Sequence, residues 1–535
     1  MIELHQLKIP LDEDGEEALR IAAAKRLHVA PDKIGQFSII RKAIDARDKR
    51  DIRFAYSVLA DLGKAESKVR LSGTDKIIKK PDKLKISPAV WNGRPVVVGA
   101  GPAGLFAALA LAQSGARPIV LERGKPIALR TGDVERMMDK GELDPESNLL
   151  FGEGGAGTFS DGKLTWRGKQ QILGAYVLET FARCGAGEEA IYDARAHVGT
   201  DRLREVITAI RGEIENLGGE FRFGCCVSGI ETRDGRLTKV KLRDGFSIDV
   251  SAMILCCGHS ARDTYAWLKE AGIALAPKPF AVGVRVEHPQ SMIDEAQFGK
   301  FAGHPALGAA SYALTAKAAD GRGVYSFCMC PGGEVVICAQ EEGALAVNGM
   351  SYHARDGKNA NSALLVQVFP EDYMEENDPL SGLRFQKAVE QKAFALGGGG
   401  FIAPAQRMDA FLSGIGQGEK FGSVAPSARP GVKACDLTQC LPDRIVRDLR
   451  EGIAQFSRKL RGFDRADAVL TGAETRSSSP VRILRGEDGC AVGCDGLYPA
   501  GEGSGYAGGI VSSAVDGLQA ALHLIERINR GNKSC

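Results

Sequence analysis

A glycine-rich segment between two apolar runs has the residue types and the spacing of a dinucleotide-binding loop. Val96–Val98 leads into Gly99, Gly101 and Gly104, and Glu122 ends the second run about 20 residues further on. The first glycine permits a tight turn, the second lets backbone N–H groups approach a pyrophosphate, and the third lets the following helix pack on the strand. The acid accepts hydrogen bonds from ribose hydroxyls, and the helix N-terminus attracts phosphates. The segment therefore predicts a βαβ unit that binds a dinucleotide.

A second glycine-rich turn near the C-terminus indicates which dinucleotide is bound. Gly501 and Glu502 end a short apolar run, and Gly508 and Gly509 precede a predicted helix that starts at Ile510. This arrangement resembles the second FAD motif of glutathione-reductase-type flavoproteins. The resemblance implies that Glu502, where that family usually has Asp, holds the ribityl chain, and that the helix N-terminus points at the flavin pyrimidine ring. An ordinary strand–turn–helix is the alternative.

Two segments between these motifs resemble other parts of the same flavoproteins. Met253–Gly258 is similar to a strand that ends in a turn beside the cofactor, and Val227 stands where such proteins cover the adenine. The two FAD motifs lie near opposite ends of the chain. Their order implies a FAD-binding domain that is split by an inserted domain.

Longer strings resemble one bacterial family, the uncharacterised FAD-dependent dehydrogenases. These strings are Phe151–Leu164, His197–Asp201, Gly258–Thr264 and Tyr325–Gly333. The resemblance covers nearly the whole chain and implies a fold and a FAD cofactor, but no substrate. The motifs and this resemblance together assign the following residues to the cofactor: Gly99, Gly101, Pro102, Ala103, Gly104, Glu122, Arg123, Gly154, Gly155, Gly157, Thr158, Ser160, Asp161, Lys163, Val227, Gly258, Gly501, Glu502, Gly508, Gly509 and Ile510.

The predicted fold class is α/β. It comprises a Rossmann-like FAD-binding domain of the glutathione-reductase type, split by an inserted α+β substrate domain, and a small ferredoxin-like α+β domain at the N-terminus. The expected domains are residues 1–88 (N-terminal), 91–275 and 470–535 (the two parts of the FAD-binding domain) and 276–469 (the insert).

Periodicity predicts the elements of the N-terminal domain. Glu3–Ile9 alternates as a strand does, and Asp14–Leu27 has the apolar spacing of a helix. Ile34–Ile44 and Asp51–Leu59 are expected to form a further strand–helix–strand passage.

Hydride transfer is the expected chemistry, because it belongs to the flavin and needs no nucleophile triad. His259, Tyr325 and Tyr506 are candidate proton donors, although His259 is equally a turn residue that bonds backbone. Arg476, which precedes the second FAD motif, is expected to reach the flavin or a substrate anion.

Four residues of the predicted insert allow two interpretations. Cys328 and Cys330 occupy alternate positions of a predicted strand, so both side chains are expected on one face, either as a redox pair or as small buried hydrophobes. Arg285 and Glu287 also alternate on one strand face, which is directed either at the substrate or at solvent.

Composition excludes several classes of protein. With 535 residues, 44% hydrophobic and 25% charged, the chain is neither disordered nor fibrous. A net charge of +2 gives no global field towards nucleic acid or anionic lipid. The 13 cysteines include adjacent pairs and no separated CxxC motifs, which favours a reducing cytoplasm and no metal site. We find no signal peptide and no apolar stretch long enough to span a membrane.

A small-molecule substrate is the default partner, and two alternatives stay open. Residues 1–90 carry 19 basic and 14 acidic residues, so a redox protein could dock on residues 1–88. An RNA-modifying flavoenzyme is the second alternative, although no aromatic residues alternate with the lysines and nucleic acid is therefore disfavoured. The chain has one complete βαβ fingerprint and lacks the CxxxxC pair of disulfide reductases, so NADH or NADPH would bind only transiently.

Overall fold

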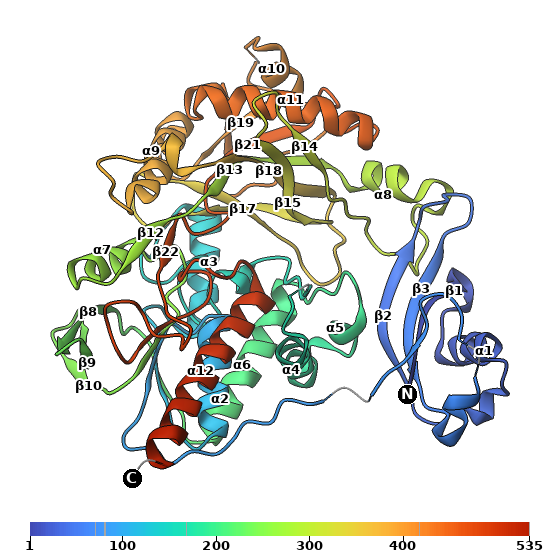
Figure 1. Ribbon diagram of the computed structural model, residues 1–535. Coiled ribbons are helices and arrows are strands. Elements are labelled where there is room, and N and C mark those ends of the chain that lie inside the picture. The colour runs from blue at the N-terminus through green and yellow to red at the C-terminus, as the bar shows by residue number, and fades with distance from the viewer. Residues whose placement is uncertain (70, 80–81, 167, 417, 534–535) are drawn as a thin grey trace.

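The structure is a computed structural model that describes residues 1–69, 71–79, 82–166, 168–416 and 418–533. Figure 1 shows three parts, with a small N-terminal domain on the right, a helix-rich part below and a sheet-rich part above. Among the described residues, no helix is both long and apolar enough to cross a membrane.

The N-terminal domain is a four-stranded antiparallel sheet that carries one helix. β3 lies between β1 and β2, as in a split βαβ motif, and β4 pairs with the other edge of β1. The strand–helix–strand passage predicted over Ile34–Ile44 and Asp51–Leu59 is wrong, because β2 and β3 form a hairpin around a short charged turn. The elements are β1 Ile2–Pro10, α1 Glu16–Leu27, β2 Phe37–Asp45, β3 Arg53–Ala60 and β4 Lys76–Ile77.

This domain packs against the rest of the chain. The backbone N–H of Ala194 donates to the Lys42 carbonyl at 2.9 Å, and Lys49 Nζ donates to the Ala296 carbonyl at 2.5 Å. His304 Nε2 lies 3.2 Å from a carboxylate oxygen of Asp12. The domain therefore contacts both larger parts, while its docking of a redox partner stays a prediction.

A five-stranded parallel sheet, in the order β23-β11-β5-β6-β7, forms the core of the lower part. Apart from β7, every strand is fully buried, as expected for a parallel sheet covered on both faces. Because β23 comes from the far end of the chain, this sheet is built from two segments. The strands are β5 Val96–Val98, β6 Ile119–Leu121, β7 Glu220–Arg222, β11 Met253–Leu255 and β23 Leu497–Pro499.

Helices α2 and α12 lie side by side against this sheet (Figure 1). α2 is buried from Ala103 to Ala112, which explains why its sequence is almost wholly apolar. α12 closes the domain by packing on α2 and α4. The helices of this part are α2 Pro102–Gln113, α3 Ile127–Lys140, α4 Gln171–Phe181, α5 Glu189–Tyr192, α6 Thr200–Asn216, α7 Arg262–Glu270 and α12 Ile510–Lys533.

Three small sheets complete the packing around the two larger ones. β8, β9 and β10 form an antiparallel sheet in the lower part, β12 pairs with β22, and β16 pairs with β17. These strands are β8 Val227–Arg233, β9 Arg236–Leu242, β10 Ser247–Asp249, β12 Leu275–Pro277, β16 Glu334–Cys338, β17 Ala346–Met350 and β22 Val481–Ile483.

The upper part is a seven-stranded mixed sheet in the order β14-β15-β18-β13-β21-β19-β20. α11 lies across the half of this sheet formed by β14, β15, β18 and β13 (Figure 1), and its apolar residues are buried there. The elements are β13 Phe280–Pro289, α8 Gln290–Phe298, β14 Thr315–Lys317, β15 Gly323–Cys330, β18 Asn359–Val368, α9 Ser381–Gly397, β19 Ala403–Arg407, α10 Met408–Ser413, β20 Val432–Ala434, α11 Asp443–Lys459 and β21 Val469–Glu474.

One predicted boundary of this insert is displaced. The sequence analysis assigned residues from 470 onwards to the FAD-binding domain, whereas β21 pairs with β13 and β19 in the upper sheet. The insert therefore extends through Glu474. Periodicity within one strand does not reveal which distant strand it pairs with, so this boundary was hidden in the sequence.

The core of the insert contains a histidine whose burial makes stability depend on pH. His288 is fully buried, its Nε2 lies 2.7 Å from the Phe463 carbonyl, and burial lowers its pKa to about 4 from 6.5. Between these values the unfolded chain binds a proton that the native chain excludes, so native stability falls as pH falls from about 6.5 to 4. We expect His288→Gln to remove up to about 3 kcal/mol of this pH dependence.

Urea unfolding at several pH values measures that change. His28→Asn is the matched control, since His28 is exposed at the left-handed end of α1, and it should keep the wild-type pH dependence. The same acid destabilisation in His288→Gln as in the wild type would contradict the assignment.

Candidate functional site

A large cavity lies between the parallel sheet of the lower part and the mixed sheet of the insert. The space inside it, which includes open solvent, is about 1730 Å³. One end is lined by Gly99, Gly101 and Glu122, and the other by Asn348 and Glu474 of the insert. Its extent from one domain to the other suits an elongated ligand such as a dinucleotide.

The first glycine-rich loop has the geometry that its sequence predicts. Gly99 has a φ of +96°, and a Cβ there would lie 2.3 Å from the Cys256 carbonyl oxygen. A Cβ on Gly104 would lie 1.8 Å from the Gly99 carbonyl oxygen, so α2 packs on the loop only with glycine at that position. The N-cap residue of α2, Gly101, has no capping side chain, and the first turn can therefore present its backbone N–H groups to a phosphate.

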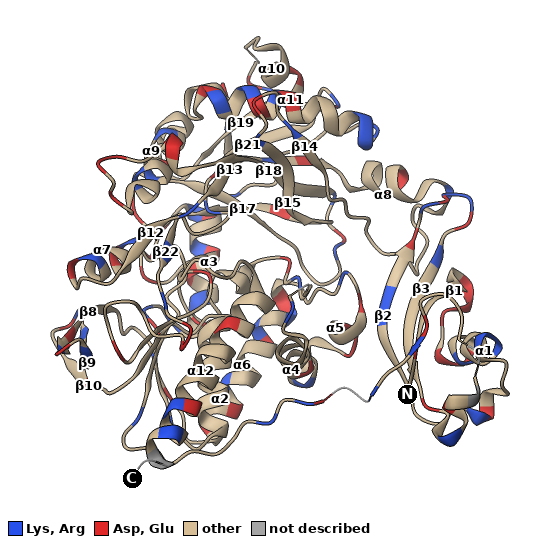
Figure 2. Ribbon diagram, in the orientation of Figure 1, with Lys and Arg blue, Asp and Glu red and all other residues tan. Residues whose placement is uncertain are grey.

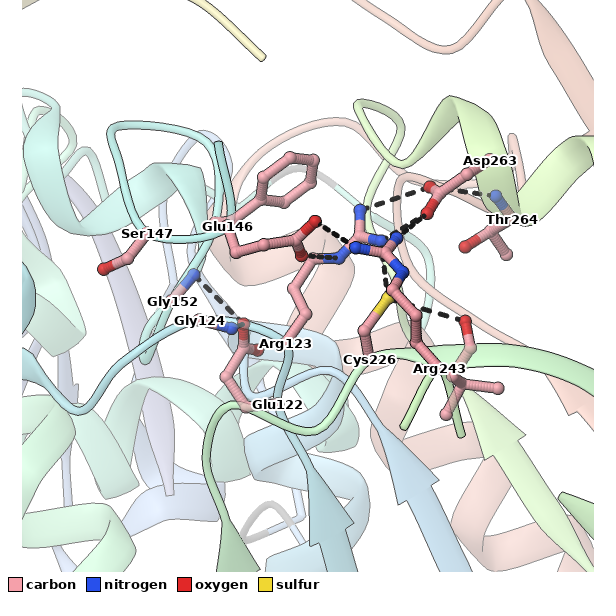
Figure 3. A network of polar contacts seen from close by, with 12 residues as sticks. Glu122, Arg123, Gly124, Glu146, Ser147, Gly152, Cys226, Arg243, Asp263 and Thr264 are labelled. Carbon is pink, nitrogen blue, oxygen red and sulfur yellow. Dashed lines mark hydrogen bonds and ion pairs between the residues drawn. The ribbon is translucent and has the colours of Figure 1, made fainter. Parts of the chain in front are cut away.

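Glu122 organises the same loop through its carboxylate (Figure 3). Its Oε2 accepts the Ala100 N–H at 2.8 Å, and its Oε1 accepts the N–H groups of Gly124 and Gly152 at 2.9 and 3.0 Å. The carboxylate is buried at the cavity wall, where its remaining lone pairs suit the ribose hydroxyls.

Arg123 ties three segments together next to Glu122 (Figure 3). Its guanidinium pairs with Glu146 at 3.1 Å and with Asp263 at 2.5 Å, and it also lies 2.8 Å from Cys226 Sγ. Arg243 pairs with the same two carboxylates, so the two acids bridge two arginines. This network attaches the start of α7 to the loop that carries the predicted ribose acceptor.

The second glycine-rich turn meets the first at the cavity. The Gly501 N–H donates to the Asp516 carboxylate at 2.8 Å, and a Cβ on Gly501 would lie 2.7 Å from the Ala103 Cβ. Glu502 lies 3.4 Å from His259 Nδ1, while His259 Nε2 is buried without a hydrogen-bond partner among the described residues. An unpartnered buried nitrogen at a cavity wall is what a missing ligand would leave behind.

Arg130 is a fully buried arginine of α3 that the sequence analysis missed, and it holds the loop that follows α3 in place. Arg130 donates from Nε to the Asn148 carbonyl at 2.9 Å and from Nη1 to the Glu153 and Gly155 carbonyls at 2.6 and 2.9 Å. Burial lowers the pKa of Arg130 to about 10. The sequence did not identify Arg130, because it stands in an amphipathic helix and the carbonyls that it binds belong to another segment.

The insert contributes a buried ion pair to the other end of the cavity. Arg285 Nε and Nη2 donate to the Glu474 carboxylate at 2.7 and 3.0 Å, and Nη1 donates to Asn361 at 2.6 Å. Both Arg285 and Glu287 are completely buried, so the interpretation of a solvated sheet face is wrong, and neither side chain lines the cavity. Of the two residues only Glu474 lines the cavity, and Arg285 binds its carboxylate from the core of the insert.

A second ionic cluster joins the loop at residue 161 to the insert. The Asp161 carboxylate accepts Arg355 Nε at 2.9 Å and lies 2.8 Å from Lys163 Nζ. Burial alone would raise the pKa of Asp161, but Lys163 and Arg355 outweigh it and hold that pKa well below its usual range. Lys163 also donates to the Met329 carbonyl, so its charge lies beside the Cys328–Cys330 segment.

Arg476 reaches the cavity as predicted but already has a counter-ion. Its Nε and Nη2 donate to Glu390 at 3.1 and 2.9 Å, and Arg262 Nη2 donates to the same carboxylate at 2.9 Å. Burial raises and the two arginines lower the pKa of Glu390, which falls to about 2. Arg262 also pairs with Glu341 at 3.9 Å, so each arginine of this cluster has a carboxylate partner.

Most predicted cofactor residues line this one cavity: Gly99, Gly101, Pro102, Ala103, Glu122, Arg123, Gly155, Gly157, Ser160, Asp161, Lys163, Val227, Gly258, Gly501, Glu502, Gly508, Gly509 and Ile510. Gly104, Gly154 and Thr158 lie behind the wall, where they shape the loops. Gly154, for example, donates its N–H to the Ala100 carbonyl at 2.8 Å.

The candidate catalytic residues divide in the same way. His259, Cys328 and Arg476 line the cavity, whereas Cys330 is buried behind it. Tyr325 and Tyr506 do not line it, and Tyr506 is 41% exposed and lies under the Arg485 guanidinium at 4.0 Å. Among the described residues, no cluster of His, Cys, Asp and Glu could hold a metal ion.

Comparison with protein families assigns the cofactor. A family model described as "FAD-dependent protein, C-terminal domain-like" matches residues 279–477, which is the insert including β21. A FAD-binding-domain model matches residues 94–134, which hold the first glycine-rich loop and Glu122, and a domain of unknown function matches residues 1–61. These matches confirm FAD as the cofactor predicted from the motifs.

Two relatives and one solved structure complete the comparison. Protein FixC of Escherichia coli (strain K12) is 28% identical over 205 residues, which are 37% of this chain and 44% of FixC. A geranylgeranyl bacteriochlorophyll reductase-like structure from Thermoplasma acidophilum covers 82% of this chain and 79% of its own at 11% identity, with a TM-score of 0.35 that is too low to carry an argument. An uncharacterised protein of Clostridium beijerinckii is 45% identical over 533 residues, 99% of each chain. With this relative, the chain belongs to a family of uncharacterised FAD-dependent oxidoreductases.

Proposed function

We propose that this flavoprotein transfers a hydride between non-covalently held FAD and a small organic substrate that binds between the two sheets. The observation that carries the proposal is the single cavity, which is lined at one end by the βαβ fingerprint and at the other by the insert. We assign the FAD-binding part to the glutathione-reductase type, because β23, the second glycine-rich turn and α12 return to the first motif from the far end of the chain.

The cavity wall suggests which residues would hold each part of the cofactor. Gly99–Gly101 and the α2 N-terminus would hold the pyrophosphate, Glu122 the adenosine ribose and Val227 the adenine. Glu502 and the turn before α12 would hold the ribityl chain and the flavin. When bound there, FAD supplies two-electron redox chemistry.

The chain's own residues orient the substrate and move its proton. The helix N-terminus at Ile510 offers partial positive charge to the flavin end of the cavity. His259 offers an unpartnered Nε2 at the wall, where it could donate or accept a proton. Arg476 lines the cavity, and its Nη1 is buried without a hydrogen-bond partner among the described residues, which favours a substrate that carries an anionic group.

Absorption spectroscopy of the purified protein tests this function. We expect an oxidised-flavin spectrum and release of all FAD into the supernatant on acid precipitation, as non-covalent binding requires. Anaerobic addition of NADH and NADPH, separately, then shows whether a nicotinamide donates the electrons, since a productive donor bleaches the visible band. Colourless protein that does not bind added FAD would overturn the proposal, and flavin that remains with the precipitate would overturn non-covalent binding.

A further inference from the structure

Cys328 and Cys330 stand on a strand that is distorted at this point, with Cys328 at the cavity wall. β15 pairs with β18 through Phe327 opposite Ala363 and then Cys330 opposite Asn361, so one extra residue is inserted between them. Cys328 takes a positive φ of +43° within this bulge. Such a bulge re-aims side chains, and bulges are enriched next to active sites. Cys328 consequently lines the cavity and Cys330 is buried behind it, which corrects the expectation of a regular strand with both thiols on one face.

Two cations flank the Cys328–Cys330 segment. Arg285 Nη1 lies 3.3 Å from the Cys328 carbonyl and 4.0 Å from Cys330 Sγ, and Lys163 Nζ bonds the Met329 carbonyl between the two thiols. Cys330 Sγ donates to the Cys328 backbone carbonyl at 3.3 Å, which fixes the Cys330 side chain beside the Cys328 backbone. Asp161 and Glu474 are the acids that face these cations, and each is already engaged by an arginine.

These surroundings give the two thiols different protonation states. Hydrogen bonding from Cys330 lowers the pKa of Cys328 against the opposing effect of burial, and the charges of Lys163 and Arg285 lower it further. The interaction with the Cys328 side chain, together with burial, raises the pKa of Cys330. The segment thus favours one thiolate and one thiol, as a nucleophilic cysteine with a resolving partner requires.

The alternative role of these cysteines is to pack in the core, because buried cysteine behaves as a small hydrophobe. The other described cysteines fit that interpretation, since burial raises the pKa of each of them, as it does for Cys256, Cys338 and Cys440. Cys328 is the exception among the described cysteines, and it is also the one on a strained, bulged backbone at the cavity wall.

We propose that Cys328 and Cys330 form a redox-active dithiol that exchanges two electrons with FAD in this cavity, which rests on the FAD site proposed above. The Cys328 thiolate and the Cys330 thiol join in a disulfide. The S–H bond of Cys330 breaks, and two electrons and that proton pass to the bound FAD, so charge and atoms balance without another reagent. The reverse step regenerates the dithiol, and a dithiol or disulfide compound can exchange with the pair at Cys328, which is the more exposed thiol.

Electron counting on the holoprotein tests the proposal. The protein is oxidised with hexacyanoferrate, freed of excess oxidant and titrated anaerobically with dithionite, with uptake expressed per bound FAD. We expect four electrons for the wild type and two for Cys328→Ser and for Cys330→Ser. Cys184→Ser, a thiol outside the cavity, is the matched control and should still take up four. Two electrons in the wild type would overturn the dithiol while leaving the flavin function intact.

Peptide mapping gives a readout that does not depend on the flavin signal. Trypsin releases residues 323–355, which contain Cys328, Cys330 and also Cys338 as an internal standard. After oxidation, denaturation and N-ethylmaleimide labelling, we expect one label on Cys338 and a Cys328–Cys330 disulfide. After dithionite reduction we expect three labels. Three labels in both states, or a disulfide that involves Cys338, would overturn the dithiol. Protein that does not bind FAD would instead contradict the proposed function.

Discussion

Replacing Glu122 by glutamine should weaken FAD binding about 100-fold. The carboxylate accepts three backbone N–H groups from the loops that surround the first glycine-rich turn. A glutamine side chain places an NH₂ group against at least one of these donors and removes the charge that strengthens the others. Hydrogen bonds to charged groups contribute about 1.5–3 kcal/mol each, so the loss of one or two amounts to about 3 kcal/mol, or roughly 100-fold in Kd.

Titration of the apoprotein with FAD, followed by flavin fluorescence, measures the change. Glu146→Gln is the matched control: Glu146 is a neighbouring carboxylate in the Arg123 network, but it makes no hydrogen bond to the glycine-rich loop (Figure 3). It should bind FAD with close to wild-type affinity. Equal Kd values for Glu122→Gln and the wild type would remove Glu122 from the cofactor site.

Replacing Glu474 by methionine should destabilise the protein by about 3–5 kcal/mol, which corresponds to a fall in Tm of roughly 10 °C. The change leaves Arg285 charged and buried without its partner, and an arginine does not lose its proton to escape that cost. Arg285→Met should cost less, because burial already raises the pKa of Glu474 and the carboxyl can take up a proton. The double variant Arg285→Met/Glu474→Met should lie closer to the wild type than Glu474→Met does.

Thermal unfolding of the three variants checks this order. Glu375→Gln serves as the surface control, since Glu375 pairs with Arg384 in an exposed position and exposed pairs contribute little. An unchanged Tm in Glu474→Met would show that the pair is not needed for stability. A double variant that is less stable than Glu474→Met would show that packing rather than charge governs this position.

The cofactor site could be predicted in large part because its signals are local. Gly104 is required by the Gly99 carbonyl only five residues away, and Gly99 by its positive φ and by the Cys256 carbonyl at the end of the adjoining strand. Strand β1 and helix α1 were likewise predicted within two residues, since alternation and helical spacing depend on near neighbours. The strand–helix–strand passage predicted over Ile34–Ile44 and Asp51–Leu59 was wrong, because β2 and β3 pair directly through a short charged turn.

The insert was the harder part, because its important contacts join distant segments. Arg285 and Glu474 are 189 residues apart, and each alone resembles a charge on an alternating strand. Strand β21 could not be assigned to its sheet before its pairing with β13 and β19 was known. Arg130 had no motif at all, because its partners are backbone carbonyls.

Sequence alone predicted a dinucleotide-binding unit, because turn geometry and strand–loop–helix spacing are properties of short segments, and the resemblance of its second glycine-rich turn to known flavoproteins pointed to FAD and to a split domain. Only the tertiary structure decided which charges are buried, where the insert ends and how Cys328 and Cys330 are divided between the cavity and the core. Those outcomes depend on strand pairing, on a one-residue bulge and on ions brought together from distant parts of the chain, and no local pattern encodes them.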